Sequence, residues 1–256
     1  MRLPRRLRHG EEASLVEHLD ELRSRLVTSL VALVLCAIVA LVFQHRILHW
    51  LSGPLPADRE KLTTFGVAEP FLVTFKISLW VGFGVAFPII LWQVWGFLAP
   101  AVEERTQRVV AVFVAFASLL LVAGVAFGYY VVLPKALSFL THYNDKTFNI
   151  LIRASDYYNF VLLVLVGVGV VFELPIFVLA LVRLGVLTSY RLRHTRRVGY
   201  FFVAVVGVLL PGIDPVTTTL ETVPLFVLYE GSIWLAVLME RYWARREALP
   251  LESTPL

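Results

Sequence analysis

The chain has 256 residues, of which 58% are hydrophobic and 16% are charged, and its formal net charge is +4. Soluble domains are about 45–50% apolar and about 25% charged, so this composition excludes a soluble or disordered protein and argues against binding of nucleic acid. The single cysteine, Cys36, excludes an intramolecular disulfide. We therefore predict an all-α polytopic protein that lies in the lipid bilayer.

Six apolar segments follow one another along the chain and predict six transmembrane helices. Four of them reach the length of about 20 residues that crosses a bilayer core. The last two are short, and the Pro-Gly-Ile-Asp-Pro sequence between them cannot stay helical. They either cross a locally thinned bilayer, which we favour, or form a re-entrant hairpin. The predicted spans of this single membrane domain, residues 1–256, are about 26–43, 74–98, 109–133, 158–182, 197–211 and 220–238.

Lysine and arginine residues are unevenly distributed between the predicted loops. Sixteen lie in the N-terminal segment, in the loops after the second and fourth spans, and in the tail, whereas six lie in the other loops. Because basic residues are enriched on the cytoplasmic side of a membrane, both termini are expected in the cytoplasm. Residues 239–256 then form a cytoplasmic tail.

Residues 14–25 predict an amphipathic helix that leads into the first span. It begins with a Ser-x-x-Glu capping box, and leucines at spacings of four, three and four form an apolar stripe. The opposite face carries Glu17, Asp20 and Glu21, with Arg25 one turn beyond Glu21. These carboxylates are either a solvated helix face or a patch that binds guanidinium groups, which pair with carboxylates bidentately.

Glu173 is the clearest charged residue inside a predicted span. A carboxylate there is costly unless it faces protein or water, is paired, or is protonated. Pro175 cannot donate to the Val171 carbonyl, so the pair predicts a kinked, locally polar site. The alternative is a neutral glutamic acid that hydrogen-bonds a neighbouring helix. Glu230 in the last span is likewise either a functional polar group or a structural one, and for this residue we favour the structural role.

Motifs of enzyme chemistry are absent from the sequence. It contains no Gly-x-Ser-x-Gly, no His-Glu-x-x-His, no P-loop and no Cys/His spacing typical of a metal site. We therefore predict a protein that is not an enzyme and binds no metal or cofactor. One functional alternative is a proton-coupled small-molecule transporter centred on Glu173, although only Glu230 adds a second clear polar group within the spans.

The segment His18–Arg25, HLDELRSR, resembles the N-terminal signature of the TatC family, the multi-spanning receptor subunits of the twin-arginine protein translocase. The Pro-Gly-Ile-Asp turn lies where the family has its short last periplasmic loop. The resemblance extends over nearly the whole chain. Further similar motifs, in the family's order, are SGPL at 52–55, EPF at 69–71, PIILWQVWGFLAP at 88–100 and FELP at 172–175.

This resemblance implies a receptor for signal peptides with paired arginines. It also implies single-span partner subunits of the TatA/TatB type, self-association, and export of folded proteins by the proton-motive force across a bacterial or archaeal cytoplasmic membrane. The residues expected to bind the signal peptide are Glu21, Arg23, Arg25, Glu103, Glu104, Glu17 and Asp20, and those expected to form an intramembrane polar site are Glu173 and Pro175. Partner subunits are expected to dock at Asp214, Thr218 and Glu230. A structural role is expected for Pro54, Phe71, Pro88, Gln93 and Phe97.

The first cytoplasmic loop departs from the family pattern. Thr106 stands where the family usually has a glutamate, six residues after the proline that matches Pro100. Glu103 or Glu104 is expected to take its place, with Glu104 preferred. Both can instead be acids that stabilise the N-terminus of a following helix.

Overall fold

The computed structural model describes residues 15–56, 62–98, 106–143, 147, 151–183, 185–210 and 214–247. Over these ranges the chain is helical, and its only β contact is an isolated bridge between Thr63 and Arg153. The predicted all-α class is therefore confirmed. The chain divides into two compact units, one formed by Met1–Gly53, Thr63–Ser118 and Arg153–Tyr158, the other by Pro54–Leu62, Leu119–Ile152 and Asn159–Leu256.

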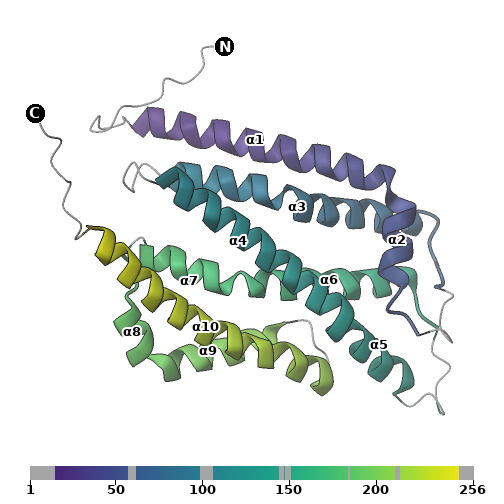
Figure 1. Cartoon of the computed structure of the whole chain (residues 1–256). Coiled ribbons are helices and arrows are strands. Elements are labelled where there is room, and N and C mark those ends of the chain that lie inside the picture. The colour runs from purple at the N-terminus through teal and green to yellow at the C-terminus, as the bar shows by residue number, and fades with distance from the viewer. Residues whose placement is uncertain are drawn as a thin grey trace, which may run out of the picture. The chain divides into compact units, whose positions relative to one another are not determined.

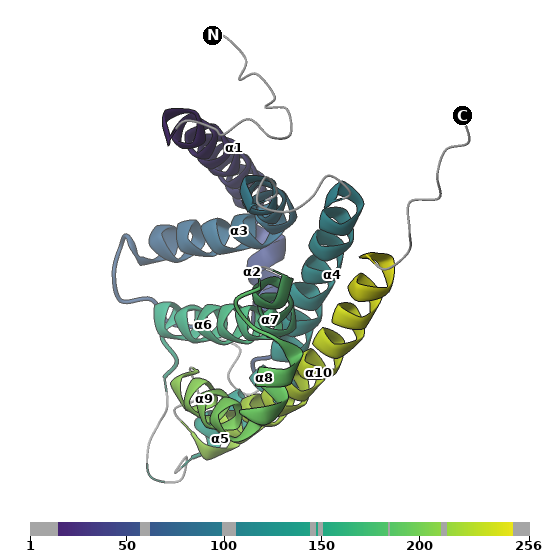
Figure 2. The same cartoon turned by 90° about the vertical axis from the view of Figure 1, so that its left-hand side faces the viewer.

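The first unit is built on α1 (Leu15–Val42) and α3 (Glu69–Leu98), which lie side by side (Figures 1 and 2). A glycine makes their close approach possible: a Cβ built on Gly82 would lie 2.6 Å from the backbone of Ala37. Small residues have this role between membrane helices because lipid provides no hydrophobic driving force between helices, and packing must hold them together.

The short helix α2 (Gln44–Ser52) follows α1 directly and is fixed by the start of α6 (Ala154–Phe172). The Tyr157 hydroxyl donates to the Leu51 carbonyl at 2.8 Å, and Leu51 is almost fully buried. A buried tyrosine hydroxyl needs such a partner. The bond therefore holds two segments together that are about a hundred residues apart in the sequence.

The third predicted span, residues 109–133, belongs to a longer helical run. It begins as α4 (Thr106–Phe127), passes through the π-helical turn η3 (Gly128–Val132) and ends as α5 (Leu133–His142). Single π-turns inside α-helices locally shift the side-chain register. The helix therefore continues beyond the apolar run that predicted it.

The fourth predicted span is interrupted at Glu173, as its sequence predicts. Helix α6 ends at Phe172, and α7 (Leu174–Arg183) begins one residue later. Pro175 has no backbone N–H to donate to Val171, and the Glu173 N–H instead donates to the Val170 carbonyl at 3.1 Å. The proline thus explains the break.

Three helices complete the second unit: α8 (Ser189–His194), α9 (Arg196–Leu209) and α10 (Pro215–Glu247). Helix α10 packs against α7 and α9. Here too a glycine permits close contact, because a Cβ on Gly199 would overlap the ring of Tyr229. The same device therefore occurs in both units.

Helix α10 corrects the expected extent of the last helix. The apolar segment at 220–238 predicts a short one, whereas α10 has 33 residues. The extra turns are polar but remain helical: Asp214 caps the N-terminus, and the Thr219 hydroxyl donates to the Pro215 carbonyl one turn back. Apolar length alone could not reveal these local hydrogen bonds.

Five helices are long and apolar enough to cross a membrane within the described ranges. Helix α9 has only 14 residues, or about 21 Å at 1.5 Å per residue, so the crossing expected at 197–211 stays a prediction. The five candidates are His18–Val42, Glu69–Phe97, Val110–His142, Ala154–Arg183 and Pro215–Tyr242.

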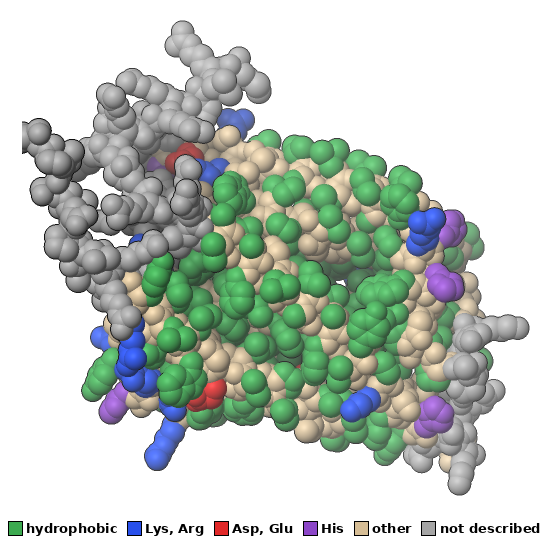
Figure 3. Space-filling model, in the orientation of Figure 1, with side chains coloured by type: hydrophobic (Ala, Val, Ile, Leu, Met, Phe, Trp, Pro, Cys, Tyr) green, Lys and Arg blue, Asp and Glu red, His purple; other side chains and the backbone are tan. Residues whose placement is uncertain are grey.

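The exposed surface supports a lipid environment. Figure 3 shows hydrophobic side chains over most of the face in view, with few charged groups among them. On α1, Leu26 is 67% exposed, and its neighbours on the leucine stripe are exposed as well. In water such a surface would cause aggregation, whereas in a bilayer it is the favourable one.

We expect Gly82→Ala to destabilise the first unit, because the new Cβ would lie 2.6 Å from the Ala37 backbone. Overpacking of this kind costs about 1–3 kcal/mol. Thermal unfolding of the purified protein in detergent measures the effect. Gly84→Ala is the matched control in the same helix, since its Cβ would meet nothing within 4 Å. Equal melting temperatures for the two variants would contradict the proposed close packing.

Candidate functional site

A half-buried ion pair lies near the N-terminal end of α1. Arg25 Nη2 and Nε both donate to Glu21 Oε1, at 2.5 Å and 3.0 Å. The two side chains are 27% (Glu21) and 26% (Arg25) exposed. They are four residues apart on one helix, the spacing at which a carboxylate and a following cation meet. The one-turn spacing seen in the sequence therefore brings Glu21 and Arg25 into an ion pair.

The guanidinium of Arg25 extends from α1 onto α3. Its Nη1 donates to the main-chain carbonyl of Gln93 at 3.5 Å. It also lies against Gly96, where an added Cβ would be 1.9 Å from Nη1 and 2.9 Å from the Arg25 Cζ. An added Cβ would displace this end of the flexible Arg25 side chain, so in the arrangement seen here α3 forms a shallow cradle for the cationic group at Gly96.

An aromatic contact lies on the same side of α1. The ring of His18 stacks on Phe97 with centroids 4.4 Å apart and an interplanar angle of 22°. Together with the Arg25 contacts, this contact fixes the first turns of α1 against the C-terminal turns of α3. Sequence reasoning assigned Phe97 and Gln93 a structural role, but it missed His18 and Gly96 as members of this cluster.

The other predicted signal-peptide residues are only partly described. Asp20 and Arg23 are exposed on α1. The side chain of Glu17, and Glu103 and Glu104 as whole residues, lie outside the described part of the chain. The structure therefore brings Glu21 and Arg25 together with α3 and leaves the loop half of the expected site untested.

Glu173 lies at the break between α6 and α7 in the second unit. Its Oε1 is buried without a hydrogen-bond partner among the described residues. Pro175 is buried beside it, and the preceding Phe172 packs so closely on α4 that a Cβ on Gly124 would lie 2.8 Å away. Glu173 is thus a partly satisfied carboxyl in tightly packed surroundings, and its role as an intramembrane polar group stays a prediction.

Asp214 has a clear local role at the start of α10. Its carboxylate accepts from the Thr217 N–H at 2.8 Å and from the Thr217 hydroxyl at 2.5 Å, and the residue is buried. The Thr218 hydroxyl donates to the Asp214 carbonyl at 3.0 Å. Of the residues expected to dock partners, Asp214 is therefore the N-cap of α10, and Thr218 lies in its first turn with its hydroxyl bonded back to Asp214.

Glu230, the third of these residues, joins α10 to α9. Its carboxylate accepts the Tyr200 hydroxyl, and Arg196 Nη2 lies 3.8 Å from Oε2. This acid inside the last predicted span thus has a partner on the neighbouring helix, which fits the structural weight that the sequence gives it.

Glu221 is a buried acid that sequence reasoning did not assign. It is 3% exposed, and neither carboxyl oxygen has a hydrogen-bond partner in the described part of the chain. It lies two turns after Asp214, on the helix face that Thr217 also occupies. The spacing of three and then four residues was the available signal.

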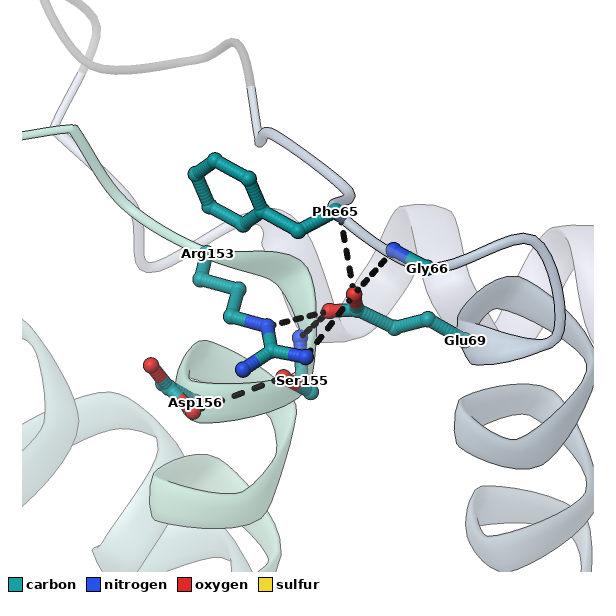
Figure 4. A network of polar contacts seen from close by, with 6 residues as sticks. All are labelled: Phe65, Gly66, Glu69, Arg153, Ser155 and Asp156. Carbon is teal, nitrogen blue, oxygen red and sulfur yellow. Dashed lines mark hydrogen bonds and ion pairs between the residues drawn. The ribbon is translucent and has the colours of Figure 1, made fainter.

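A second unassigned acid, Glu69, organises the loop before α3 (Figure 4). Its carboxylate accepts the backbone N–H groups of Phe65, Gly66 and Ser155 at 3.0–3.2 Å. It also accepts two hydrogen bonds from Arg153, from Nε at 3.0 Å and from Nη2 at 3.1 Å. The carboxylate raises the pKa of the Arg153 guanidinium above its usual value, chiefly through these hydrogen bonds.

The remaining structural residues have simpler surroundings. Pro54 follows the end of α2, and Pro88 lies inside α3. Phe71 is 67% exposed and stacks on Phe75 of its own helix, with centroids 6.2 Å apart. No group of three or more His, Cys, Asp or Glu side chains suited to a metal ion occurs within the described ranges.

We expect Glu69→Gln to loosen the segment at 62–69, because a neutral amide cannot accept from all five donors. Thermal unfolding and hydrogen exchange of the Phe65 and Gly66 amides measure the effect. The melting temperature should fall by several degrees and both amides should lose protection. Asp156→Asn is the control, since Asp156 is bonded only to Ser155 in this cluster and is exposed. Unchanged protection in Glu69→Gln would contradict this role.

Known proteins similar to this chain agree with one another. The family model described as Sec-independent protein translocase protein (TatC) matches residues 17–224. Sec-independent protein translocase protein TatCd of Bacillus subtilis is 34% identical over 237 residues, 93% of this chain and 97% of the relative. TatC of Escherichia coli is 32% identical over 226 residues, 87% of each chain.

The fold comparison agrees with the sequence comparisons. A crystal structure of the twin arginine translocase receptor TatC in DDM aligns with this chain at a TM-score of 0.75 and 34% identity. The alignment covers 86% of this chain and 99% of that one.

Proposed function

The chain belongs to the TatC family and is a core component of the Sec-independent protein translocase, and we propose that it receives cargo signal peptides by binding their paired arginines at Glu21. The observation that carries this proposal is the geometry of Glu21. Both hydrogen bonds from Arg25 go to one carboxylate oxygen, Oε1, and the side chain is 27% exposed. The carboxylate therefore already holds a guanidinium and stays accessible.

Arginine is the cation that this arrangement suits. A guanidinium presents a planar fork of N–H donors, whereas a lysine ammonium is a compact point charge. We propose that Glu17 and the exposed Asp20 add negative charge near the site and that Arg23 flanks it. Glu103 or Glu104 of the first cytoplasmic loop would serve the second arginine.

The membrane setting of this site is a second part of the proposal. The chain is a multi-pass membrane protein. We place both termini on the cytoplasmic side of a bacterial or archaeal cytoplasmic membrane, with α9 as a short sixth span. The distribution of lysine and arginine supports this orientation. The Glu21 site would then face the compartment in which cargo is synthesised.

A translocase component works with partner subunits and cargo. We propose that single-span TatA/TatB-type subunits dock near Asp214, Thr218 and Glu230, at and beyond the N-terminus of α10, and that copies of this chain associate. The exposed apolar surfaces of α9 and α10 support such contacts. We further propose that the chain catalyses no reaction and that the proton-motive force drives export, with Glu173 as a polar group in the path.

The proton-coupled transporter is not favoured as an alternative. The family match and the relatives are translocase components. Glu230, which would have supplied the second polar group of a transport site, is engaged by Tyr200. Glu230 therefore does not supply a free second group for a solute pathway centred on Glu173.

We expect Glu21→Gln to weaken binding of an Arg-Arg signal peptide by about tenfold or more, because a charge-assisted hydrogen-bonded pair is lost. Glu21→Lys should abolish site-specific crosslinking. Binding is measured by titrating a fluorescent signal peptide into the purified protein in lipid nanodiscs, with membrane accumulation checked in parallel.

Thr195→Lys provides the charge-matched control for Glu21→Gln. It raises the net charge by one, as Glu21→Gln does, but at an exposed residue between α8 and α9, and should leave peptide binding unchanged. If Glu21→Gln and Glu21→Lys both bind and crosslink normally, Glu21 is not the receptor group.

A further inference from the structure

We propose that Arg25 is the resting occupant of a guanidinium site formed by the Glu21 carboxylate, the Gln93 carbonyl and the backbone of Gly96, and that one arginine of the signal peptide takes over this site by displacing Arg25. The inference rests on the proposed function, which assigns Glu21 to the signal peptide. It adds a subsite on α3 and an internal competitor on α1.

The first argument is that the site fits a guanidinium. Three nitrogens of Arg25 reach oxygen atoms from two different helices: Nε and Nη2 reach Glu21 Oε1, and Nη1 reaches the Gln93 carbonyl. A forked planar cation can make these contacts together, and an ammonium group cannot. The site therefore discriminates between arginine and lysine by shape.

The second argument is that α3 leaves space for the group at one position. An added Cβ on Gly96 would lie 1.9 Å from Nη1, 2.9 Å from Cζ and 3.3 Å from Nη2 of Arg25. The Nη1 end of the guanidinium thus lies next to a stretch of backbone that carries no side chain. Glycine is unfavourable inside a helix, and at Gly96 the absence of a side chain leaves room for the Arg25 guanidinium where it lies.

The third argument is that Arg25 is held loosely enough to exchange. The pair is about one quarter exposed on each side, and ion pairs of this kind at i and i+4 are weak. The contact to Gln93 is 3.5 Å long, at the limit of a hydrogen bond. A cargo arginine is attached to an apolar signal segment that itself binds in the membrane. This additional binding energy favours the cargo arginine over Arg25 at the site.

Displacement has a consequence for selectivity. In the resting state Arg25 neutralises Glu21, so a cation that binds the carboxylate by charge alone gains little. A cargo arginine, once Arg25 leaves, can donate hydrogen bonds to both the Glu21 carboxylate and the Gln93 carbonyl. The internal competitor therefore raises the threshold for lysine-containing or other basic segments.

The first test uses Arg25→Gln, which empties the site and keeps a polar side chain. We expect the purified full-length protein in nanodiscs to bind an Arg-Arg signal peptide about two- to fivefold more tightly, the range for removal of a competing surface ion pair. Arg193→Gln removes an equal charge from an exposed residue of α8 and should give a smaller gain. Unchanged or weaker binding by Arg25→Gln, or an equal gain in both variants, would overturn the displacement.

The second test shows which arginine uses the cradle. Gly96→Ala is introduced into the Arg25→Gln protein, where no internal guanidinium remains. If the cargo arginine occupies the cradle, binding should weaken about fivefold or more, since the Cβ fills its place. Gly84→Ala in the same background is the control. If Gly96→Ala changes binding only while Arg25 is present, the cradle serves Arg25 alone and the proposal is wrong.

The peptide provides a further check on chemistry. Replacing its two arginines by citrulline keeps their shape and removes their charge, so the gain from Arg25→Gln should disappear. Glu21→Gln separates the two levels of inference. If it leaves binding intact, the proposed receptor site fails. If it weakens binding while Arg25→Gln gives no gain, only the displacement fails.

Discussion

Lipid offers no hydrogen-bonding partner, and the described part of this chain is arranged around that constraint. The backbone N–H and C=O groups of a helix hydrogen-bond to one another, and hydroxyl groups also find partners within their own helix. Thr28, Thr74 and Thr219 each donate to the carbonyl one turn back. Where the backbone leaves its helix before α3, the Glu69 carboxylate accepts the N–H groups that would otherwise be unpaired. One buried oxygen of Glu173 and both carboxyl oxygens of Glu221 lack partners among the described residues and are departures from this arrangement.

Packing between helices has a related cause. Because apolar side chains gain nothing by leaving lipid for another helix, close contact through small residues must hold the helices together. Gly82 permits it between α1 and α3, and Gly199 and Gly207 permit it between α9 and α10. Each unit therefore depends on positions where a single methyl group would force neighbouring atoms apart.

The sequence was a good guide wherever one local pattern determined the outcome. Apolar length predicted α1 and α3, and the proline at 175 predicted the break after α6. It was a poor guide where partners are remote. The Glu69–Arg153 pair joins residues 84 positions apart, and no periodicity connects them. Polar capping also extended α10 beyond the apolar run that marked it.

The candidate site shows the same division. Glu21 and Arg25 could be paired from their spacing on one helix. The contribution of Gly96 and the Gln93 carbonyl could not, because it depends on how α1 packs against α3. A glycine in an apolar helix looks the same in sequence whether it is exposed, as Gly84 is, or lies against a guanidinium from another helix.

Glu69 and Glu21 are glutamates of the same unit with opposite hydrogen-bonding states. Glu69 is 6% exposed and accepts five hydrogen bonds on its two oxygens, so a further cation would find neither space nor a free lone pair in the right direction. Glu21 is 27% exposed, and its described hydrogen bonds all go to one oxygen. A carboxylate that is fully satisfied holds a fold together, whereas one that is half satisfied and accessible can exchange one cation for another. That difference in saturation, rather than the presence of an acid, is what distinguishes the proposed receptor group from the structural one.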